Sequence, residues 1–408
     1  MGKHDDHPGK HERHGMRVFT ELISPEEALA IAQEATKPLD RIESVPLEHG
    51  VGRVLAEDVV SSVDVPAFDK AMMDGYAIRS QDAAAEGPAL DVVGDARPGE
   101  PYPGTVKGGE AVKTATGAPV PAGADAVVEV ELVEVEDSRV RVPQDIAPRR
   151  NVSLRGEDIG KGDPLLPART VLQPGHVGAI AALGVEALPV YARPRVAVMA
   201  TGREIRRGGS LRPGEVYDVN SFTLTGLIRE NGGNVEMSDP IPDTYESILD
   251  AVGRATDYDL VVLSGSTSVG ERDFLRDAAA ERGEVLFHGV AMKPGKPVLL
   301  AKVGDGLVFG MPGFPASALM AAYHFLVPVL RRMGRYPEAP SRPSILGEDM
   351  PVKGDKTQLV TVRREGGKAY QAFRGSGSIT SISQGDGYVV IAPGQALKKG
   401  TPVEVIEF

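Results

Sequence analysis

The chain has 408 residues, of which 41% are hydrophobic and 25% charged, a globular balance in a chain too long for one ordinary core. The formal net charge is −12 and no long basic run occurs, which argues against nucleic acid as the main partner. The absence of cysteine excludes disulfides, thiolate metal ligands and cysteine nucleophiles. Charge, glycine or proline interrupts every apolar stretch, so we expect no membrane partner and a cytoplasmic location.

The first 15 residues hold four of the eight histidines, His4, His7, His11 and His14. A metal-binding tail is one interpretation of this cluster. We favour a solvated extension, because such tracts lack the fixed geometry of a metal site. Residues 1–15 are therefore predicted to form a disordered tail.

The N-terminal half predicts a helix, a strand-rich module and a second helix in that order. Ser24 can cap a helix running towards Thr36, because proline and two glutamates follow it. From residue 64 to about residue 146 the chain changes to short β segments such as residues 126–130, separated by proline and glycine. Helical spacing returns at residues 173–183.

From residue 195 onwards, buried strands alternate with amphipathic helices. The predicted elements in chain order are a strand at 195–200, a helix at 221–231, a strand at 234–237, a helix at 245–255, strands at 260–263 and 307–309, and a helix at 316–333. This alternation implies right-handed βαβ crossovers and a doubly wound, mainly parallel α/β domain. Beyond residue 337 apolar residues alternate or run between turns, at residues 358–362, 388–391 and 403–406, which predicts a small β barrel or sandwich.

Three loops follow predicted strands of the α/β domain, and ligands bind outside the carboxyl ends of strands in open sheets. Their glycines and small hydroxyl residues leave backbone N–H groups available to an anion. The residues concerned are Thr201 and Gly202, then Ser264, Gly265, Ser268 and Gly270, then Pro312 and Pro315. A plain turn would explain any one loop, but three after three strands favour a phosphorylated ligand.

Charged residues lie in and beside these loops. Lys293 and Lys296 belong to a Lys-Pro-Gly-Lys-Pro segment, which cannot be a regular helix and presents two cations on a stiff loop. Glu204, Asp243 and Asp273 would repel a phosphate unless a hard cation intervened. A helix cap or a surface charge would explain any one of these acids, but the three together suggest a binding site for Mg²⁺.

Seven motifs together resemble one family, the molybdopterin molybdenumtransferases represented by MoeA and the C-terminal half of gephyrin. The motifs are MDGYA at residues 73–77, TGAPVP at 116–121, RGEDI at 155–159, TGRE at 201–204, SGSTSVG at 264–270, KPGKP at 293–297 and MPGFP at 311–315. The resemblance covers residues 16–408 and is specific through the order and spacing of the motifs.

The resemblance implies a four-domain homodimer. The implied domains are a discontinuous linker domain at residues 16–60 and 158–193, an inserted β-rich domain at 61–157, an α/β molybdopterin-binding domain at 194–336 and a C-terminal β barrel at 337–408. The implied reaction takes adenylyl-molybdopterin and molybdate, inserts the metal into the dithiolene and releases AMP, with Mg²⁺ as the accompanying ion. A transient contact with the molybdopterin adenylyltransferase is also implied.

Matching positions carry the family's site onto this chain. The resemblance implies catalytic roles for Asp74, Thr116, Asp158, Glu204 and Asp273, with Asp243 and Asp273 organising Mg²⁺. It implies substrate contacts from Arg155, Lys293, Lys296, Pro312 and Pro315, and from Ser376 and Ser381 of the barrel. Tungstate in place of molybdate, a gephyrin-like scaffold and the related adenylyltransferase activity stay open as alternatives, the last disfavoured by the additional domains.

Overall fold

The computed structural model describes residues 22–84, 87–265, 273–350, 354–372 and 379–408. The chain forms two compact units, one of residues 43–190 and the other of residues 1–42 with 191–408. The predicted N-terminal tail and the predicted site residues Ser268, Gly270 and Ser376 lie outside the described ranges. Within these ranges no helix has both the length and the apolar character needed to cross a bilayer.

The unit of residues 43–190 contains a six-stranded sheet in the order β7-β4-β6-β5-β9-β8. Its strands are β4 (Gly75–Ile78), β5 (Ala89–Ala96), β6 (Glu110–Thr114), β7 (Ala126–Glu129), β8 (Glu134–Glu136) and β9 (Arg139–Arg141). A Cβ atom on Gly75 would lie 1.9 Å from the carbonyl oxygen of Val128, so the close pairing of β4 with β7 requires glycine there. The predicted strand-rich module is confirmed.

The rest of this unit consists of short strand pairs and one helix. The pairs are β1 (Ile42–Pro46) with β12 (Ala187–Tyr191), β2 (Val59–Val60) with β11 (Pro164–Leu166), and β3 (Lys70–Ala71) with β10 (Val152–Ser153). Helix α2 (Pro174–Ala181) confirms the helix predicted at residues 173–183. Ile180 packs with Leu55, Leu172 and Leu188 in a small core. This shared core stabilises β1 and α2, since each alone would bury too little apolar surface.

The other unit is built on a six-stranded sheet in the order β16-β13-β17-β21-β20-β18. Its strands are β13 (Arg195–Ala200), β16 (Asn234–Met237), β17 (Leu260–Ser264), β18 (Glu284–His288), β20 (Leu299–Val303) and β21 (Gly306–Met311). The strands β16, β13, β17 and β21 are parallel, and β20 is antiparallel to both of its neighbours. The predicted mainly parallel sheet is confirmed.

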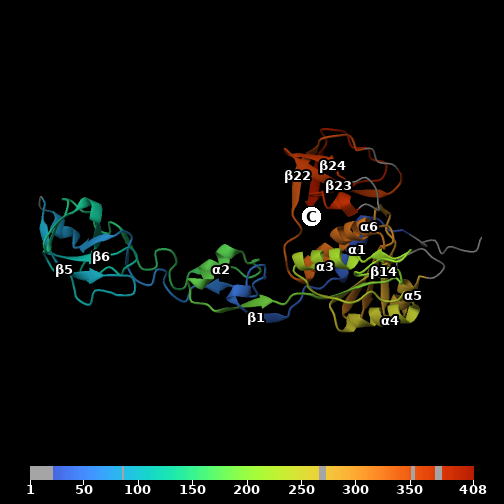
Figure 1. Cartoon of the computed structure of the whole chain (residues 1–408), viewed down its shortest axis with the longest axis horizontal. Coiled ribbons are helices and arrows are strands. Elements are labelled where there is room, and N and C mark those ends of the chain that lie inside the picture. Colours follow the sequence, from blue (N-terminus) through green and yellow to red (C-terminus); the bar gives the residue numbers. More distant parts are fainter. Residues whose placement is uncertain (1–21, 85–86, 266–272, 351–353, 373–378) are drawn as a thin grey trace, which may run out of the picture. The chain divides into compact units, whose positions relative to one another are not determined.

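Helices cover both faces of this sheet, as Figure 1 shows. On one face lie α1 (Pro25–Ala35), α3 (Asn220–Glu230), α6 (Pro315–Ala321) and α7 (Val327–Met333), and on the other lie α4 (Tyr245–Gly253) and α5 (Phe274–Arg282). Along β13, Val196 and Val198 pack with the first group, whereas Ala197 and Met199 pack with the second. A strand buried on both faces has no polar face, which explains the continuous apolar run in the sequence.

Helix α1 begins as predicted but packs in a place that the sequence did not indicate. Ser24 caps it by accepting a hydrogen bond of 3.1 Å from the backbone of Glu27. The resemblance assigned this segment to the linker domain, yet its buried face, Ala28 and Ala32, belongs to the core of the α/β block. Arg41, just beyond the helix, forms two hydrogen bonds of 2.8 and 2.7 Å to Asp259 of the same unit. Ala28 and Ala32 share this core with Val329, Leu330 and Met333 of α7.

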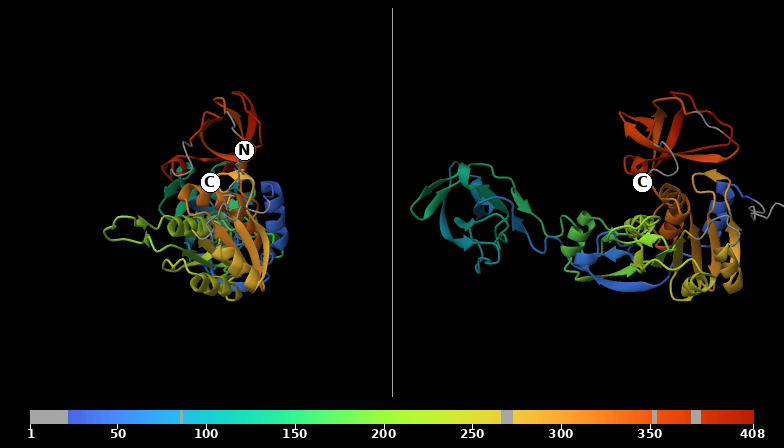
Figure 2. Two further views of the ribbon diagram at one scale, coloured as in Figure 1. Left: turned by 90° about the vertical axis from the view of Figure 1, so that its right-hand side faces the viewer. Right: turned by 45° about the vertical axis from the view of Figure 1, so that its right-hand side comes forward.

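The C-terminal strands close into a barrel, visible in red in Figure 2. The barrel comprises β22 (Ser341–Leu346), β23 (Thr357–Glu365), β24 (Lys368–Gln371), β25 (Gly387–Ile391) and β26 (Pro402–Glu407). Pairing of β23 with β25 closes the ring β23-β24-β22-β26-β25, so the predicted barrel is confirmed. The short helix α8 (Ile379–Ile382) precedes β25, and β19 (Met292–Lys293) of the α/β block pairs with β23.

A buried histidine joins the barrel to the α/β block. The helix predicted at residues 316–333 contains a π-helical turn at Ala322–Leu326 between α6 and α7. His324 lies in this turn, and its Nδ1 atom is 3.2 Å from the hydroxyl oxygen of Tyr388 on β25. Burial lowers the pKa of His324 to about 4, although the charge of Glu26 opposes this effect. The histidine is therefore neutral in the folded protein at physiological pH.

The stability of this unit should fall as the pH drops from about 6.5 to about 4. The unfolded chain protonates this histidine near its ordinary pKa of 6.5, whereas the folded chain does so only near 4. Unfolding is therefore favoured by about 3 kcal/mol more at pH 4 than at neutral pH through this residue alone. The measurement is the free energy of unfolding from denaturant titrations at several pH values, in the wild type and in His324→Gln.

The exposed His49, changed to Gln, serves as the control for loss of a histidine. The difference between the wild type and His324→Gln should change with pH, and the difference between the wild type and His49→Gln should change much less. Parallel pH profiles for the wild type and His324→Gln would contradict the buried, neutral state of His324.

Candidate functional site

Three predicted loops meet at one edge of the α/β sheet. Parallel pairing of β13 with β17 and of β17 with β21 places their carboxyl ends side by side. The backbone N–H of Thr201 donates a hydrogen bond of 2.8 Å to Ser264, and that of Gly265 donates one of 3.2 Å to Met311. Each loop is thus bonded to the next, because the strands that they follow are adjacent and parallel.

Gly265 is required by this close approach. Its φ is +107°, and a Cβ atom there would lie 2.6 Å from the carbonyl oxygen of Thr201. Both the backbone conformation and the space therefore exclude a side chain. The glycine serves the contact with Thr201, its backbone N–H donates to Met311 at 3.2 Å, and its predicted contact with a ligand stays a prediction.

A cavity of about 860 Å³ opens beside these loops. Seven of the predicted residues line it, namely Thr201, Glu204, Ser264, Gly265, Lys296, Pro312 and Pro315. Gly202 lines a smaller neighbouring cavity of about 430 Å³. Prolines and aromatic rings, including Pro297 and Tyr217, supply much of the wall of the larger cavity, which suits a flat ligand with an anionic part.

Sequence reasoning missed Asp218 and Asn220, which also line the larger cavity. The side-chain amide of Asn220 donates hydrogen bonds of 2.6 Å to the hydroxyl of Ser264 and 3.0 Å to the carbonyl of Gly313. It thereby joins the second loop to the third. An Asp-x-Asn sequence before a helix reads as a capping signal, so the sequence contained the residues but nothing that separated this bracing role from a cap.

The two predicted lysines are placed differently. Lys296 lines the cavity, whereas Lys293 lies exposed on β19 beside the barrel strand β23. Hydrogen bonds from Val290 to Lys296 at 2.9 Å and from Gly289 to Val298 at 2.8 Å hold the segment between them in a fixed loop. The prediction of a non-helical, braced loop with two cations is confirmed.

Glu204 and Asp243 are electrostatic neighbours. Desolvation and the negative charge of Glu204 raise the pKa of Asp243, and Arg203 partly opposes them. A divalent cation would relieve this repulsion, so the pair fits the one or two carboxylates with which Mg²⁺ is usually held. No cluster of three or more potential metal-ligating side chains occurs in the described ranges, so phosphate oxygens and water would have to complete the coordination.

Both carboxylate oxygens of Asp273 have a partner in the folded protein. It caps α5 by accepting a hydrogen bond of 3.1 Å from the backbone of Arg276, and its second oxygen lies 3.0 Å from Nε2 of His288. The side chains of Asp273 and His288 are 11% and 15% exposed, respectively. The position of Asp273 directly after residues 266–272 places a carboxylate at the end of the second loop, and its predicted roles in catalysis and metal binding stay predictions.

In the other unit, Asp74 and Thr116 are brought together. Oδ1 of Asp74 accepts two hydrogen bonds of 2.7 Å from Thr116, one from the backbone N–H and one from the hydroxyl. The backbone hydrogen bond has the larger effect in lowering the pKa of Asp74, and the hydroxyl bond lowers it further. Two residues 42 positions apart, which the sequence linked only by resemblance, thus form one charged site.

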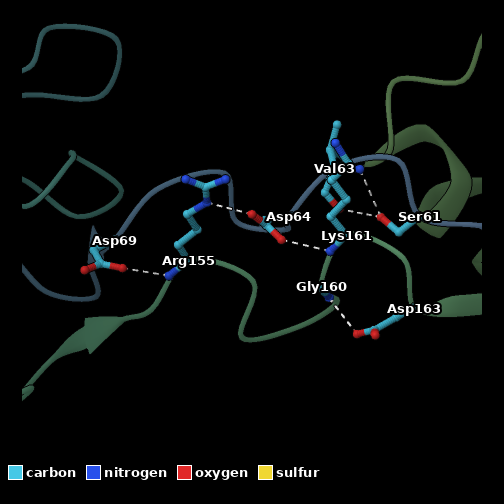
Figure 3. A network of polar contacts seen from close by, with 8 residues as sticks. All are labelled: Ser61, Val63, Asp64, Asp69, Arg155, Gly160, Lys161 and Asp163. Atoms are coloured by element: carbon cyan, nitrogen blue, oxygen red, sulfur yellow. Dashed lines mark hydrogen bonds and ion pairs between the residues drawn. The ribbon is translucent and has the colours of Figure 1, made fainter.

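Arg155 connects two chain segments, as Figure 3 shows. Its guanidinium donates a hydrogen bond of 2.6 Å to Asp64, and its backbone N–H donates one of 2.7 Å to Asp69. Asp64 also accepts a bond of 2.8 Å from the backbone of Lys161. Asp158 is exposed in the same segment, and its backbone N–H donates to Val65 at 3.1 Å. The structure thus gives Arg155 a bracing role in addition to the predicted substrate contact.

The predicted contribution of the barrel falls largely outside the described residues. Ser376 is not among them, and Ser381 is described only as part of the backbone of α8. The cavity, the braced lysine loop and the adjoining barrel define a multidomain α/β protein with a large cavity at the carboxyl ends of its parallel strands.

Three family models match the chain in succession. The MoeA N-terminal region, domains I and II, matches residues 23–184, and a probable molybdopterin binding domain matches residues 197–332. The MoeA C-terminal region, domain IV, matches residues 343–408. The chain belongs to the MoeA family.

Individual relatives agree with this assignment. A molybdopterin molybdenumtransferase of Haemophilus influenzae is 33% identical over 75% of this chain and 78% of its own length. Molybdopterin molybdenumtransferase 2 of Mycobacterium tuberculosis is 35% identical, covering 78% of this chain and 82% of the relative. The crystal structure of a molybdopterin biosynthesis MoeA protein from Pyrococcus horikosii has a TM-score of 0.81 and 35% identity, covering 95% of this chain and 99% of that chain.

Changing Thr116 to Val should raise the pKa of Asp74 towards its ordinary value, because the side-chain donor is lost while the backbone donor remains. Thr116→Ser keeps the hydroxyl and should leave the pKa low. The measurement is an NMR titration of the Asp74 carboxyl carbon in the three proteins. Equal titration midpoints in the wild type and Thr116→Val would show that the hydroxyl does not hold the carboxylate.

Proposed function

We propose that this chain is a molybdopterin molybdenumtransferase, the activity for which its relatives are named. In this proposal the enzyme inserts molybdate into the dithiolene of adenylyl-molybdopterin and releases AMP. The dithiolene sulfurs belong to the substrate, so a chain without cysteine can still transfer the metal. Molybdate is an oxyanion, which lysines and backbone amides can bind without histidine or thiolate ligands.

The observation that carries the proposal is the cavity of about 860 Å³ at the carboxyl ends of β13, β17 and β21. Its apolar wall can pack against the flat pterin. Lys296 in the same wall supplies positive charge to the phosphates. In a chain of net charge −12, such local positive groups are needed to attract so anionic a substrate.

The carboxylates have separate tasks in this proposal. Asp243 and Asp273 would hold Mg²⁺, with Glu204 beside Asp243, and the ion would neutralise charge at the phosphate bond. Asp74, held ionised by Thr116, and Asp158 act from the other unit. Lys293, together with Ser376 and Ser381 of the barrel, contacts the anionic substrate.

The proposal also covers the oligomeric state, a partner enzyme and the cellular location. We propose that the chain acts as the homodimer that its family resemblance implies. The substrate arrives adenylylated, so a transient contact with the molybdopterin adenylyltransferase fits the same scheme. A cytoplasmic location is part of the proposal.

The purified protein should release AMP from adenylyl-molybdopterin when Mg²⁺ and molybdate are present. Parallel reactions with molybdate, with tungstate and with neither oxyanion test the activity and the preference together, with AMP measured by chromatography. Faster release with tungstate would identify a tungstate-specific enzyme. No release with either oxyanion would contradict the enzymatic proposal and favour a scaffold.

Asp273→Asn should reduce AMP release by about 100-fold, since the charge proposed to hold the metal is lost. Asparagine can still cap α5, so the midpoint of thermal unfolding should change little. Asp277→Asn, one turn further along α5, is the matched control and should keep the wild-type rate. A near-full rate in Asp273→Asn would show that Asp273 is only a helix cap.

A further inference from the structure

Phe314 is an accessible aromatic residue on the wall of the larger cavity. It is 71% exposed, the highest value among the large hydrophobic residues of the described ranges. A phenylalanine on an open surface needs no explanation, since much of any folded surface is apolar. Phe314 differs because it lies in the wall of a cavity, where a bound ligand can contact its ring.

Phe314 also occupies a position that favours a polar residue. It is the N-cap of α6, and its side chain makes no capping hydrogen bond. Serine, threonine, asparagine or aspartate at an N-cap accepts a hydrogen bond from the first helical turn, which phenylalanine cannot do. The ring therefore serves the local structure neither as a cap nor by burial. Residues that break a local rule in this way are expected at functional sites.

The backbone around Phe314 is fixed by its neighbours. The side-chain amide of Asn220 donates a hydrogen bond of 3.0 Å to the carbonyl of Gly313, and Pro315 follows as the first residue of α6. The carbonyl of Phe314 accepts a hydrogen bond of 2.9 Å from the backbone of Ala318. A ring on a fixed backbone loses little conformational entropy when a ligand binds, because only its side-chain torsions remain to be ordered.

A second accessible aromatic ring belongs to the same wall. Tyr217 is 50% exposed, and its hydroxyl donates a hydrogen bond of 2.8 Å to the carbonyl of Gly209, which orients the ring. The adjacent Val216 is exposed and also lines the cavity. These side chains carry no charge, whereas Lys296 supplies charge in the same wall. The uncharged, aromatic part of the wall suits a planar ring.

We propose that Phe314 stacks on a planar heteroaromatic ring of the substrate, an inference that rests on the proposed function. Adenylyl-molybdopterin has two such rings, the pterin and the adenine, and each presents a flat face to an aromatic side chain. The contact removes from water an apolar side chain that is exposed in the free protein, and aromatic stacking adds to this gain. Phe314 is thus assigned as a substrate-binding residue.

The test compares the wild type with Phe314→Asn and Phe314→Tyr. Isothermal titration calorimetry gives the affinity of each protein for 6-hydroxymethylpterin and for AMP. Phe314→Asn should bind the stacked ring about tenfold more weakly, because stacking on the side chain is lost. Phe314→Tyr keeps an aromatic ring and should stay within about twofold of the wild type. The compound whose affinity falls identifies which of the two rings Phe314 contacts.

Thermal unfolding separates this role from a structural one. Asparagine is a favoured N-cap residue, so Phe314→Asn should raise the midpoint of unfolding or leave it unchanged while it weakens binding. A lower midpoint would overturn the assignment, since the ring would then serve the fold. Phe222→Asn is the matched control, because Phe222 is also exposed but lies on α3, outside the cavity wall. This control should bind both compounds as the wild type does.

The outcomes separate this inference from the proposed reaction. Unchanged affinity of Phe314→Asn for both compounds, or no binding of either compound to the wild type, would overturn the assignment even if the protein releases AMP. Weaker ring binding in Phe314→Asn, restored in Phe314→Tyr, would support the assignment. The same result in a protein that never releases AMP would support the assignment and contradict the transferase proposal.

Discussion

Parallel pairing of β13, β17 and β21 is the constraint on which the site in the α/β unit depends. Adjacent parallel strands run in the same direction, so the loops that follow them all leave the sheet at the edge of the carboxyl ends. Hydrogen bonds from Thr201 to Ser264 and from Gly265 to Met311 then hold the three loops against each other. Without a shared register, Thr201, Ser264 and Pro312 could not line one cavity.

The same parallel strands and loops position the charged residues around this edge of the sheet. Asn220 joins the second and third loops, and the braced loop of Lys293 and Lys296 runs between the sheet and the barrel. Burial and then the negative charge of Glu204 raise the pKa of Asp243, and a bound cation would oppose this effect. The same wall contains apolar residues and Lys296, to which the proposed function assigns the pterin and the attached diphosphate.

Polar contacts elsewhere hold distant parts of the chain together. His324 and Tyr388 meet where the α/β block and the barrel share one apolar core, and burial keeps the histidine neutral. In the other unit, Arg155 and Asp64 brace two segments that are 91 positions apart in the chain. Both contacts are long-range, so no local pattern in the sequence could have indicated the partners.

The sequence by itself determined the strands, most helices and the loops that carry the site. A continuous apolar run specified the buried strand at residues 195–200, and Ser24 specified the start of α1, because both signals act through residues close in the chain. The motifs also identified the family, since their order and spacing are properties of the sequence alone. Only the tertiary structure decided that α1 packs on the α/β block, that His288 approaches Asp273 and that Asp218 and Asn220 border the cavity. These features depend on which surfaces meet after folding, and the energy of such contacts is absent from any local stretch of residues.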